Sequence, residues 1–230
     1  MSSNRHEEHR DQSCDTGIVN KENAVSTGAS AGDVVVVLLA AGAGNRFKEI
    51  EHKLLARLTA TGPTILEQAL TRALDASLGP VLIIIGALDE AALRADPALA
   101  RLLDDDRITV RHNPDWAAGQ ATSVQVAVTS AAALGADAIV VGLADQPLID
   151  VIAWQQVAQG LGPITVATYD GRRSNPVKLH ASVWGLLSAS GDEGARVLMR
   201  QRPDLVVEVP CPGSPADIDT VEDLHRWQNN

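Results

Sequence analysis

A glycine-rich loop near residue 40 carries the residue types and spacing best suited to chemistry on a phosphate. Small residues let a backbone approach a phosphate closely, and successive N–H groups can form an anion-binding nest. Arg46 and Lys53 would add positive charge for the outer phosphates. On spacing alone, a tight turn without any ligand is an equal alternative. The loop runs Leu39-Ala40-Ala41-Gly42-Ala43-Gly44-Asn45-Arg46-Phe47.

Two further segments supply carboxylates that could hold a metal ion. Asp145 comes shortly after an apolar run, and Asp217 and Asp219 flank Ile218 near the C-terminus. A carboxylate just past a buried strand is well placed to bind Mg²⁺, which prefers oxygen ligands and bridges phosphates. Asp217 and Asp219 would point the same way in an extended segment and could join the same metal. The alternative for each is an ordinary turn or helix-capping acid.

Two common nucleotide-binding loops do not fit this pattern. The dinucleotide fingerprint needs a third glycine where the chain has Phe47, and an acid after the next strand where Ile85 leads into Gly86. The ATPase loop needs Gly-Lys-Ser/Thr, which the sequence lacks. A nicotinamide-dependent dehydrogenase is therefore disfavoured.

The elements that must position these residues alternate between strand and helix, which predicts a βαβ-type, mainly parallel sheet between layers of helices. Ligands of such sheets bind beyond the carboxyl ends of the strands, which brings together residues 40–53, 113–123, 142–147 and 217–220. Strands are predicted at Val34–Leu39, Val81–Ile85, Ile108–Arg111, Ala138–Val141, Ile164–Thr168 and Val206–Val209. Helices are predicted at Thr64–Ala76, Glu90–Leu103, Thr122–Leu134, Val151–Val157, Val183–Leu187, Ala195–Met199 and Thr220–Trp227.

Composition narrows the class of protein further. The 230 residues suit one α/β domain over residues 33–230, after a polar and disordered tail over residues 1–32. A net charge of −10 argues against general nucleic-acid or anionic-membrane binding. No apolar run reaches the roughly 18 residues of a membrane span, and the N-terminus lacks the apolar core of a secretory signal. A cytoplasmic protein with reduced cysteines is expected.

Taken together, the motifs resemble those of the molybdenum cofactor nucleotidyltransferases, and among them most those of the cytidylyltransferases. The likeness covers residues 34–227 and follows the order of that family. It begins with the glycine loop and a Lys seven residues after Arg46. It continues through Asn113-Pro114-Asp115-Trp116, Gly119 and Ser123, Ala144-Asp145-Gln146-Pro147-Leu148, Asn175-Pro176-Val177, Gly191–Arg196 and Asp217–Leu224.

The resemblance implies a Rossmann-like nucleotidyltransferase fold and transfer of CMP from CTP to the phosphate of molybdopterin, with release of pyrophosphate. Gly42, Gly44, Arg46 and Lys53 would hold the triphosphate, and Asp145, Asp219 and Asp217 would bind Mg²⁺. The Ala40-Ala41 pair favours CTP. The other nucleotide contacts would be Leu39, Ala43, Gly119 and Ser123.

The acceptor side is less well defined, because Ser174-Asn175-Pro176-Val177 stands where the family commonly has Gly-His-Pro-Val. Asn175, Arg173 and Arg196 are the expected acceptor contacts, although some basic residues in these segments would merely be solubilising charges. Trp116 could stack on a ring or simply pack over the sheet edge. The alternatives are a related enzyme with another nucleotide, such as a guanylyltransferase, and a non-catalytic carrier that delivers the cofactor to a molybdoenzyme.

Overall fold

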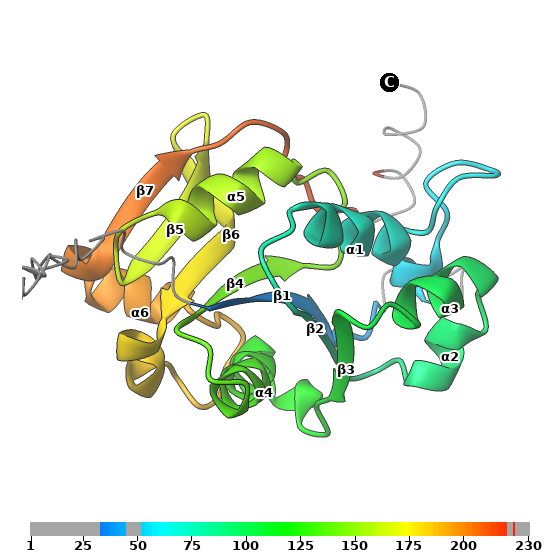
Figure 1. The fold of residues 1–230 in the computed structure, drawn as a ribbon, viewed down its shortest axis with the longest axis horizontal. Coiled ribbons are helices and arrows are strands. Elements are labelled where there is room, and N and C mark those ends of the chain that lie inside the picture. Colours follow the sequence, from blue (N-terminus) through cyan, green and yellow to red (C-terminus); the bar gives the residue numbers. More distant parts are fainter. Residues whose placement is uncertain (1–32, 45–51, 220–222, 224–230) are drawn as a thin grey trace, which may run out of the picture. The chain divides into compact units, whose positions relative to one another are not determined.

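Apolar, β-branched runs form the strands of one mainly parallel sheet, as their composition predicts. The computed structural model describes residues 33–44, 52–219 and 223, and within them seven strands stand in the order β3-β2-β1-β4-β6-β5-β7 (Figure 1). Strand β6 alone among these runs antiparallel to its neighbours. The strands are β1 (Val34–Ala40), β2 (Val81–Ile85), β3 (Ile108–His112), β4 (Ala138–Leu143), β5 (Ile164–Tyr169), β6 (Arg172–His180) and β7 (Val206–Pro210).

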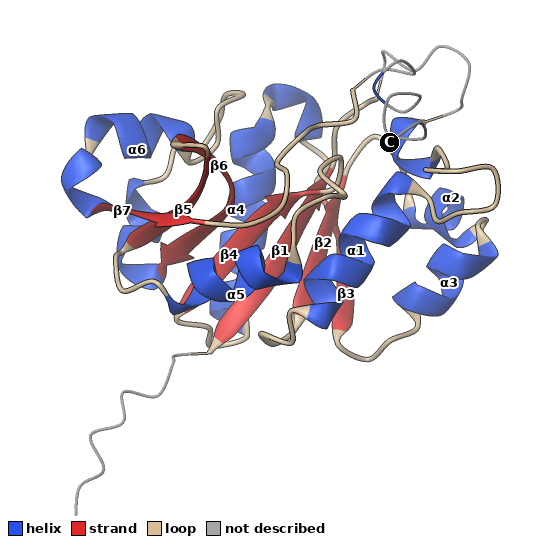
Figure 2. Ribbon diagram, turned by 90° about the horizontal axis from the view of Figure 1, so that it is seen from above, coloured by secondary structure: helices blue, strands red, loops and turns tan. Residues whose placement is uncertain are grey.

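Helices lie on both faces of the sheet and complete the predicted three-layer α/β architecture, which is confirmed (Figure 2). The α-helices are α1 (Ile65–Asp75), α2 (Glu90–Arg94), α3 (Pro97–Leu103), α4 (Gln120–Ala133), α5 (Val151–Gln159) and α6 (Arg196–Gln201). Short 3-10 helices are η1 (Lys53–Leu55), η2 (Trp116–Ala118), η3 (Ala181–Leu186) and η4 (Pro203–Leu205). None of the described helices is long and apolar enough to cross a membrane.

Strand β6 is absent from the predicted set because its sequence is largely polar and only three of its nine residues are buried. It forms a hairpin with β5 through Asp170 and Gly171, whose φ angles are 49° and 76°. An Asp-Gly pair with two positive φ angles is typical of a two-residue hairpin turn. That pair was the available signal for this strand.

The prediction of a single helix over Glu90–Leu103 is wrong, because the chain forms α2 and α3 there. Asp96 ends the first segment and caps the second, with its Oδ1 accepting from the N–H groups of Ala98 and Leu99. Pro97 suits the first position of a helix but cannot continue one. The predicted tail over residues 1–32 and most of the predicted helix Thr220–Trp227 lie outside the described residues.

Alternate residues of the central strands enter two separate apolar cores, one on each face of the sheet. Leu38 and Ala40 of β1 pack with residues of α1 and α5. Val37 and Leu39 pack with residues of α4 and α6. Successive side chains of a strand point to opposite faces of the sheet. The last residues of β1, which lead into the glycine loop, therefore alternate between the two cores.

Strand β1 lies at the point where the order of the parallel strands reverses. It pairs with β2 on one side and β4 on the other, and Leu39 stands opposite Leu143 in the β1–β4 pairing. The carboxyl ends of β1 and β4 are therefore adjacent. Open α/β sheets bind ligands in the crevice at such a switch point.

Gly142 in β4 provides a test of the core. A Cβ at this position would lie 2.3 Å from Cη2 of the buried Trp154. Gly142→Ala should therefore destabilise the fold by about 1–3 kcal/mol through overpacking, measured by urea unfolding. Gly185→Ala is the matched control, because a Cβ there meets nothing within 4 Å. Equal stability of the two variants would contradict this packing.

Candidate active site

A cavity of about 360 Å³ opens where the carboxyl ends of β1 and β4 meet. The two strand ends are joined by a hydrogen bond of 3.0 Å from the Ala144 N–H to the Leu39 carbonyl. Gly42 and Asp145 line the same cavity, so the glycine loop and the first acid lie on one edge of the sheet, as expected. The lining residues are Leu39, Ala41, Gly42, Trp116, Ala117, Gly119, Gln120, Ser123, Leu143, Asp145 and Asp192.

The glycine loop borders this cavity through Leu39, Ala41 and Gly42. Gly42 is exposed, and a Cβ there would meet nothing within 4 Å, so its backbone borders open space. Gly44 has a φ of +62°, a conformation that favours glycine. Ala40 packs in the core on the α1 face, and neither it nor Ala43 lines the cavity. Arg46 lies outside the described residues.

Lys53 brings the two acidic segments together. Its Nζ lies 2.6 Å from Oδ2 of Asp145 and 2.9 Å from Oδ1 of Asp219. The lysine side chain is only 14% exposed. Burial by itself would lower the pKa of Lys53, but the charges and hydrogen bonds of the two carboxylates outweigh it and raise that pKa. Lys53 is therefore a firmly protonated cation between two acids.

The C-terminal acidic segment is anchored to the end of β4. The Ile218 N–H donates to the Asp145 carbonyl at 3.0 Å, and the Ile218 side chain is 2% exposed within the core. With Ile218 pointing inward, Asp217 and Asp219 flank it on the outside. Burial, followed by the charge of Asp145, raises the pKa of Asp217, which accepts a hydrogen bond of 2.8 Å from Gln146.

This cluster suits a divalent cation. Asp145 and Asp219 both contact the ammonium group of Lys53, and the charge of Asp145 acts on the nearby Asp217. The ammonium shows that two of these acids already converge on one cationic position. The described residues include no group of three or more His, Cys, Asp or Glu side chains arranged to hold a metal ion. Mg²⁺ typically takes one or two carboxylates and completes its shell with substrate phosphates and water, and Asp145 and Asp219 could supply those carboxylates.

His52 closes the glycine turn against the segment that carries Lys53. Its Nε2 lies 2.9 Å from the Gly42 carbonyl, and its Nδ1 accepts from the Leu54 N–H at 3.2 Å. Burial is the largest influence on its pKa and lowers it. The hydrogen bond to Gly42 opposes this effect, and the charge of Lys53 adds to it.

The opposite wall of the cavity is built at the start of α4. Gly119 has a φ of +108°, and a Cβ there would lie 2.5 Å from the backbone of Gly191, so the position requires glycine. The buried Ser123 accepts a hydrogen bond of 2.9 Å from Asn113 Nδ2. Both predicted residues therefore line the cavity, and both also have a structural role.

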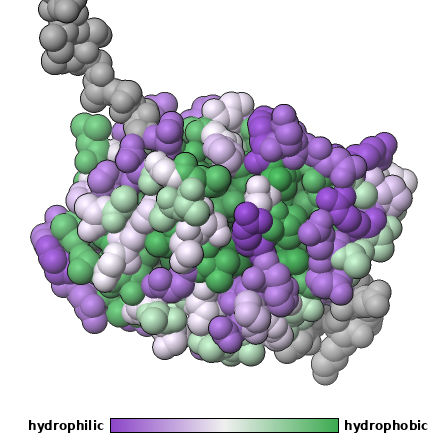
Figure 3. All heavy atoms as spheres, turned by 60° about the horizontal axis from the view of Figure 1, so that its bottom comes forward, coloured by the Kyte–Doolittle hydropathy of each residue, from purple (hydrophilic) through white to green (hydrophobic). Residues whose placement is uncertain are grey.

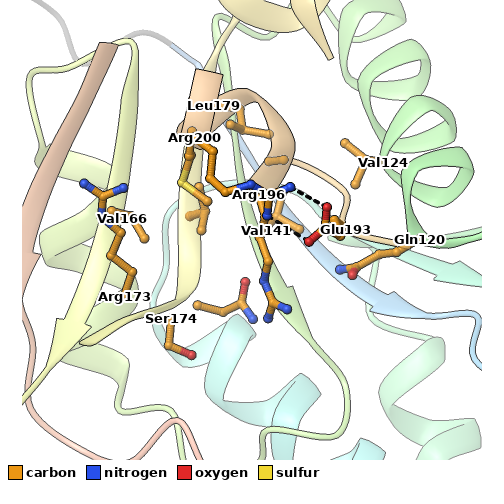
Figure 4. Close-up of a pocket in the computed structure, with 14 residues that line it drawn as sticks. Gln120, Val124, Val141, Val166, Arg173, Ser174, Leu179, Glu193, Arg196 and Arg200 are labelled. Atoms are coloured by element: carbon orange, nitrogen blue, oxygen red, sulfur yellow. Dashed lines mark hydrogen bonds and ion pairs between the residues drawn. The ribbon is translucent and has the colours of Figure 1, made fainter. Parts of the chain in front are cut away.

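A second cavity, of about 240 Å³, lies beside the first and shares Gln120 with it (Figure 4). It has an apolar floor of valines, Leu179 and Met199, and a rim of arginines. The predicted acceptor residues Arg173, Asn175 and Arg196 all line it. Figure 3 turns the α4 side of the molecule forward and shows hydrophobic residues gathered between hydrophilic ones on that face.

The basic residues around this second cavity are not equivalent. Arg173 pairs with Glu208 at 2.7 Å, and Arg200 pairs with Glu193. In Figure 4, Arg200 turns toward Glu193, whereas Arg196 extends away from that pair. Within the described part of the chain, Arg196 makes no ion pair, so it is the cation best placed to receive an anionic group.

A hydrogen-bonded chain links the second cavity to the acidic cluster. Asn175 Nδ2 donates to Gln146 Oε1 at 3.0 Å, and Gln146 Nε2 donates to Asp217 Oδ1 at 2.8 Å. Gln146 is 4% exposed and donates a further bond to the Pro215 carbonyl at 3.0 Å. Asn175 thus has a positioning contact in addition to its place in the cavity.

Three residues of this site were not singled out from the sequence: His52, Gln120 and Gln146. The signal for Gln146 was its place between Asp145 and Pro147 at a strand end. His52 gave no local signal, since its partner Gly42 lies ten residues away. For Trp116, left open between stacking and packing, the structure places it in the wall of the first cavity.

A doubly wound sheet with a small-residue loop and acids at its switch point is an arrangement that suits a nucleotide-binding enzyme. Residues 36–206 match the MobA-like NTP transferase domain. The chain belongs to that family of nucleotidyltransferases.

One similar protein is named for a redox activity instead of a transfer reaction. The chain is 34% identical over 207 residues to the nicotine blue oxidoreductase of Paenarthrobacter nicotinovorans, which covers 84% of this chain and 95% of that protein. The match therefore spans most of both proteins. The name of the relative describes an oxidoreductase, not a transferase.

Solved structures give the same fold. Rv0371c from Mycobacterium tuberculosis has a TM-score of 0.66 and 25% identity, over 87% of this chain and 100% of that one. Rv0371c in complex with manganese has a TM-score of 0.64 and 24% identity, over 86% and 99% of the chains. A nucleotidyl transferase from Methanothermobacter has a TM-score of 0.67 and 19% identity, over 85% and 96%.

The lowered pKa of His52 predicts a pH dependence of stability. The unfolded chain keeps the ordinary value of 6.5, whereas the folded value lies below it. As the pH falls below the ordinary value, the unfolded state therefore binds more protons, and the folded protein loses stability. His52→Gln should make the free energy of unfolding fall less steeply between pH 7.5 and pH 5, measured by urea unfolding. Parallel curves for the two proteins would refute the assignment of a buried, neutral imidazole.

Proposed function

We propose that this protein transfers CMP from CTP to the phosphate of a molybdopterin-type acceptor and releases pyrophosphate. The observation that carries the proposal is the position of Lys53. Its ammonium group lies between Asp145 and Asp219 at the edge of the sheet where Gly42 opens onto a cavity. A triphosphate and its metal ion need a cation, carboxylates and accessible backbone N–H groups close together.

The nucleotide would occupy the first cavity, with its phosphates toward the glycine turn. Gly42 leaves room for a phosphate to approach the backbone, and Lys53 can balance the charge of the outer phosphates. Arg46 would assist from the same loop. CTP is the proposed nucleotide on the basis of Ala40-Ala41 and the family resemblance, with Gly119 and Ser123 in the opposite wall.

Asp145 and Asp219, with Asp217 beside them, would hold Mg²⁺. The convergence of Asp145 and Asp219 on one cationic position supports a divalent ion, and so does the manganese complex of the mycobacterial protein. When bound, such an ion neutralises the charge that develops on the departing pyrophosphate.

The acceptor would occupy the second cavity, with its ring over the apolar floor and its phosphate near Arg196. An oxygen of the acceptor phosphate attacks the α-phosphorus of CTP. The bond from that phosphorus to the bridging oxygen breaks, and pyrophosphate leaves with the bonding electrons. A phosphate monoester, whose second pKa is about 6, is already largely dianionic at neutral pH and needs no general base. The residues of the chain therefore act by alignment and charge neutralisation.

The oxidoreductase relative supports one competing function, a redox reaction of nicotine blue or a related compound. In that case the second cavity would take this compound, and the first would take the redox partner. A third possibility, a carrier that binds finished cofactor, has no need for the cation and acids around a triphosphate. A transferase that prefers GTP would use the same site.

Turnover assays separate these functions. The protein is incubated with Mg²⁺, molybdopterin and each of the four NTPs, and pyrophosphate release is measured. We expect release with CTP above the other nucleotides. A strong preference for GTP would defeat the proposed base choice. Oxidation of NADPH that depends on nicotine blue, without any pyrophosphate release, would instead establish the redox function.

Asp145→Asn tests the acid that faces the nucleotide cavity. The change keeps the shape of the side chain and removes its charge, so pyrophosphate release should fall by about 10²-fold or more. The melting temperature should fall only modestly, because Lys53 keeps its contact with Asp219. Asp106→Asn is the matched control, since Asp106 is exposed just before β3, at the opposite edge of the sheet. Full activity of Asp145→Asn would contradict the proposed role of Asp145 in metal binding.

Arg196→Ala tests the acceptor side. Because Arg196 is the cation without an ion pair in the described part of the site, its loss should raise the KM for the acceptor about tenfold. The KM for CTP should stay within about twofold. Arg202→Ala, which removes an arginine paired with Asp204, is the control. A change in the KM for CTP alone would place Arg196 at the nucleotide instead.

A further inference from the structure

We propose that His52 is a positioning residue that locks the glycine turn and Lys53 into one phosphate-binding unit. This inference rests on the proposed function, because it assigns His52 to the same triphosphate site. His52 does not line the first cavity. It acts through Gly42, which lines that cavity, and through Lys53, which contacts the cavity residue Asp145.

The two ring nitrogens of His52 each hold a different part of the chain. The Leu54 N–H donates to Nδ1 at 3.2 Å, so Nδ1 carries a lone pair. In a neutral ring the proton is then on Nε2, which donates to the Gly42 carbonyl at 2.9 Å. The first bond caps η1, which begins at Lys53, and the second ties that cap to the glycine turn.

Burial and close packing make this link specific. His52 is 4% exposed, so a lost hydrogen bond at either nitrogen would leave a buried polar group without a partner. A Cβ on Gly44 would lie 3.2 Å from Nε2 of His52 and 3.2 Å from Cγ of Lys53. The turn therefore packs directly on both residues, and a shift of the imidazole would move the Gly42 backbone relative to the lysine.

The consequence for a triphosphate is geometric. The Gly42 backbone borders the cavity, and Asp145, which also lines it, holds Lys53 together with Asp219. A phosphate chain that contacts both the turn and the lysine needs a constant separation between them. His52 sets that separation through a contact ten residues apart in sequence.

Two conservative variants of His52 each keep one of its two hydrogen bonds and remove the other. Glutamine places an amide N–H near the position of Nε2 and keeps the donor to Gly42. Asparagine places an oxygen near the position of Nδ1 and keeps the cap on Leu54, but it cannot reach Gly42. Both remain polar and smaller than imidazole, so each serves as the packing control for the other.

The test measures the affinity of the full-length wild type and both variants for CTP and for CMP, with Mg²⁺ present, by isothermal titration calorimetry. His52→Asn should bind CTP about tenfold more weakly, as expected for a lost buried hydrogen bond, while its affinity for CMP changes less than about threefold. His52→Gln should bind CTP within about threefold of the wild type.

Three results would overturn the assignment: unchanged CTP affinity in His52→Asn, equal weakening of CTP and CMP, or equal losses in both variants. A wild type that binds no nucleoside triphosphate would defeat the proposed function, and this inference with it. Wild-type binding of CTP together with an unaffected His52→Asn variant would defeat the inference alone.

A measurement without any nucleotide supports the same test. The ¹⁵N signals of the His52 ring, assigned by their loss in His52→Gln, should report a neutral imidazole with the proton on Nε2 at pH 7.5. A proton on Nδ1, or a cationic ring at that pH, would contradict the hydrogen bonds on which the proposal stands.

Discussion

One ammonium group between two carboxylates is the interaction on which this site depends. Lys53 joins three stretches of chain that are far apart in sequence, since Asp145 lies 92 residues away from it and Asp219 lies 166 residues away. A partly buried ion pair of this kind requires close geometry, because the desolvation of the charges must be offset by their contact. The sheet supplies that geometry by ending β1 and β4 side by side. Ile218 adds the C-terminal acids by anchoring their backbone to Asp145.

Sequence patterns were sufficient for the central frame and for the residue types of the site. The runs that form β1, β2 and β4 are apolar throughout because both faces of those strands are buried, so their composition alone identifies them. Their carboxyl ends then indicate where Gly42 and Asp145 must lie. The polar strand β6 has no such composition, and its only local mark was the Asp170-Gly171 turn. Contacts such as His52 with Gly42 depend on the fold and leave no periodic trace.

The comparison with an oxidoreductase of similar sequence shows why fold and family do not settle the reaction. Both transfer of a nucleotidyl group and reduction of a ring require two neighbouring spaces for two small molecules. What distinguishes the reactions is the chemistry around the phosphates. The carboxylates that converge on Lys53 suit a metal-bound triphosphate, whereas a hydride donor has no use for them. The assignment therefore rests on this cluster rather than on overall similarity.

Gln120 forms part of the wall of both cavities, and this shared boundary has a kinetic consequence. Two ligands separated by one side chain can react with each other directly, so no covalent adduct of the enzyme has to carry the nucleotidyl group between them. In the proposed reaction, both substrates would then have to be present before either product departs. Double-reciprocal plots at several acceptor concentrations would intersect instead of running parallel.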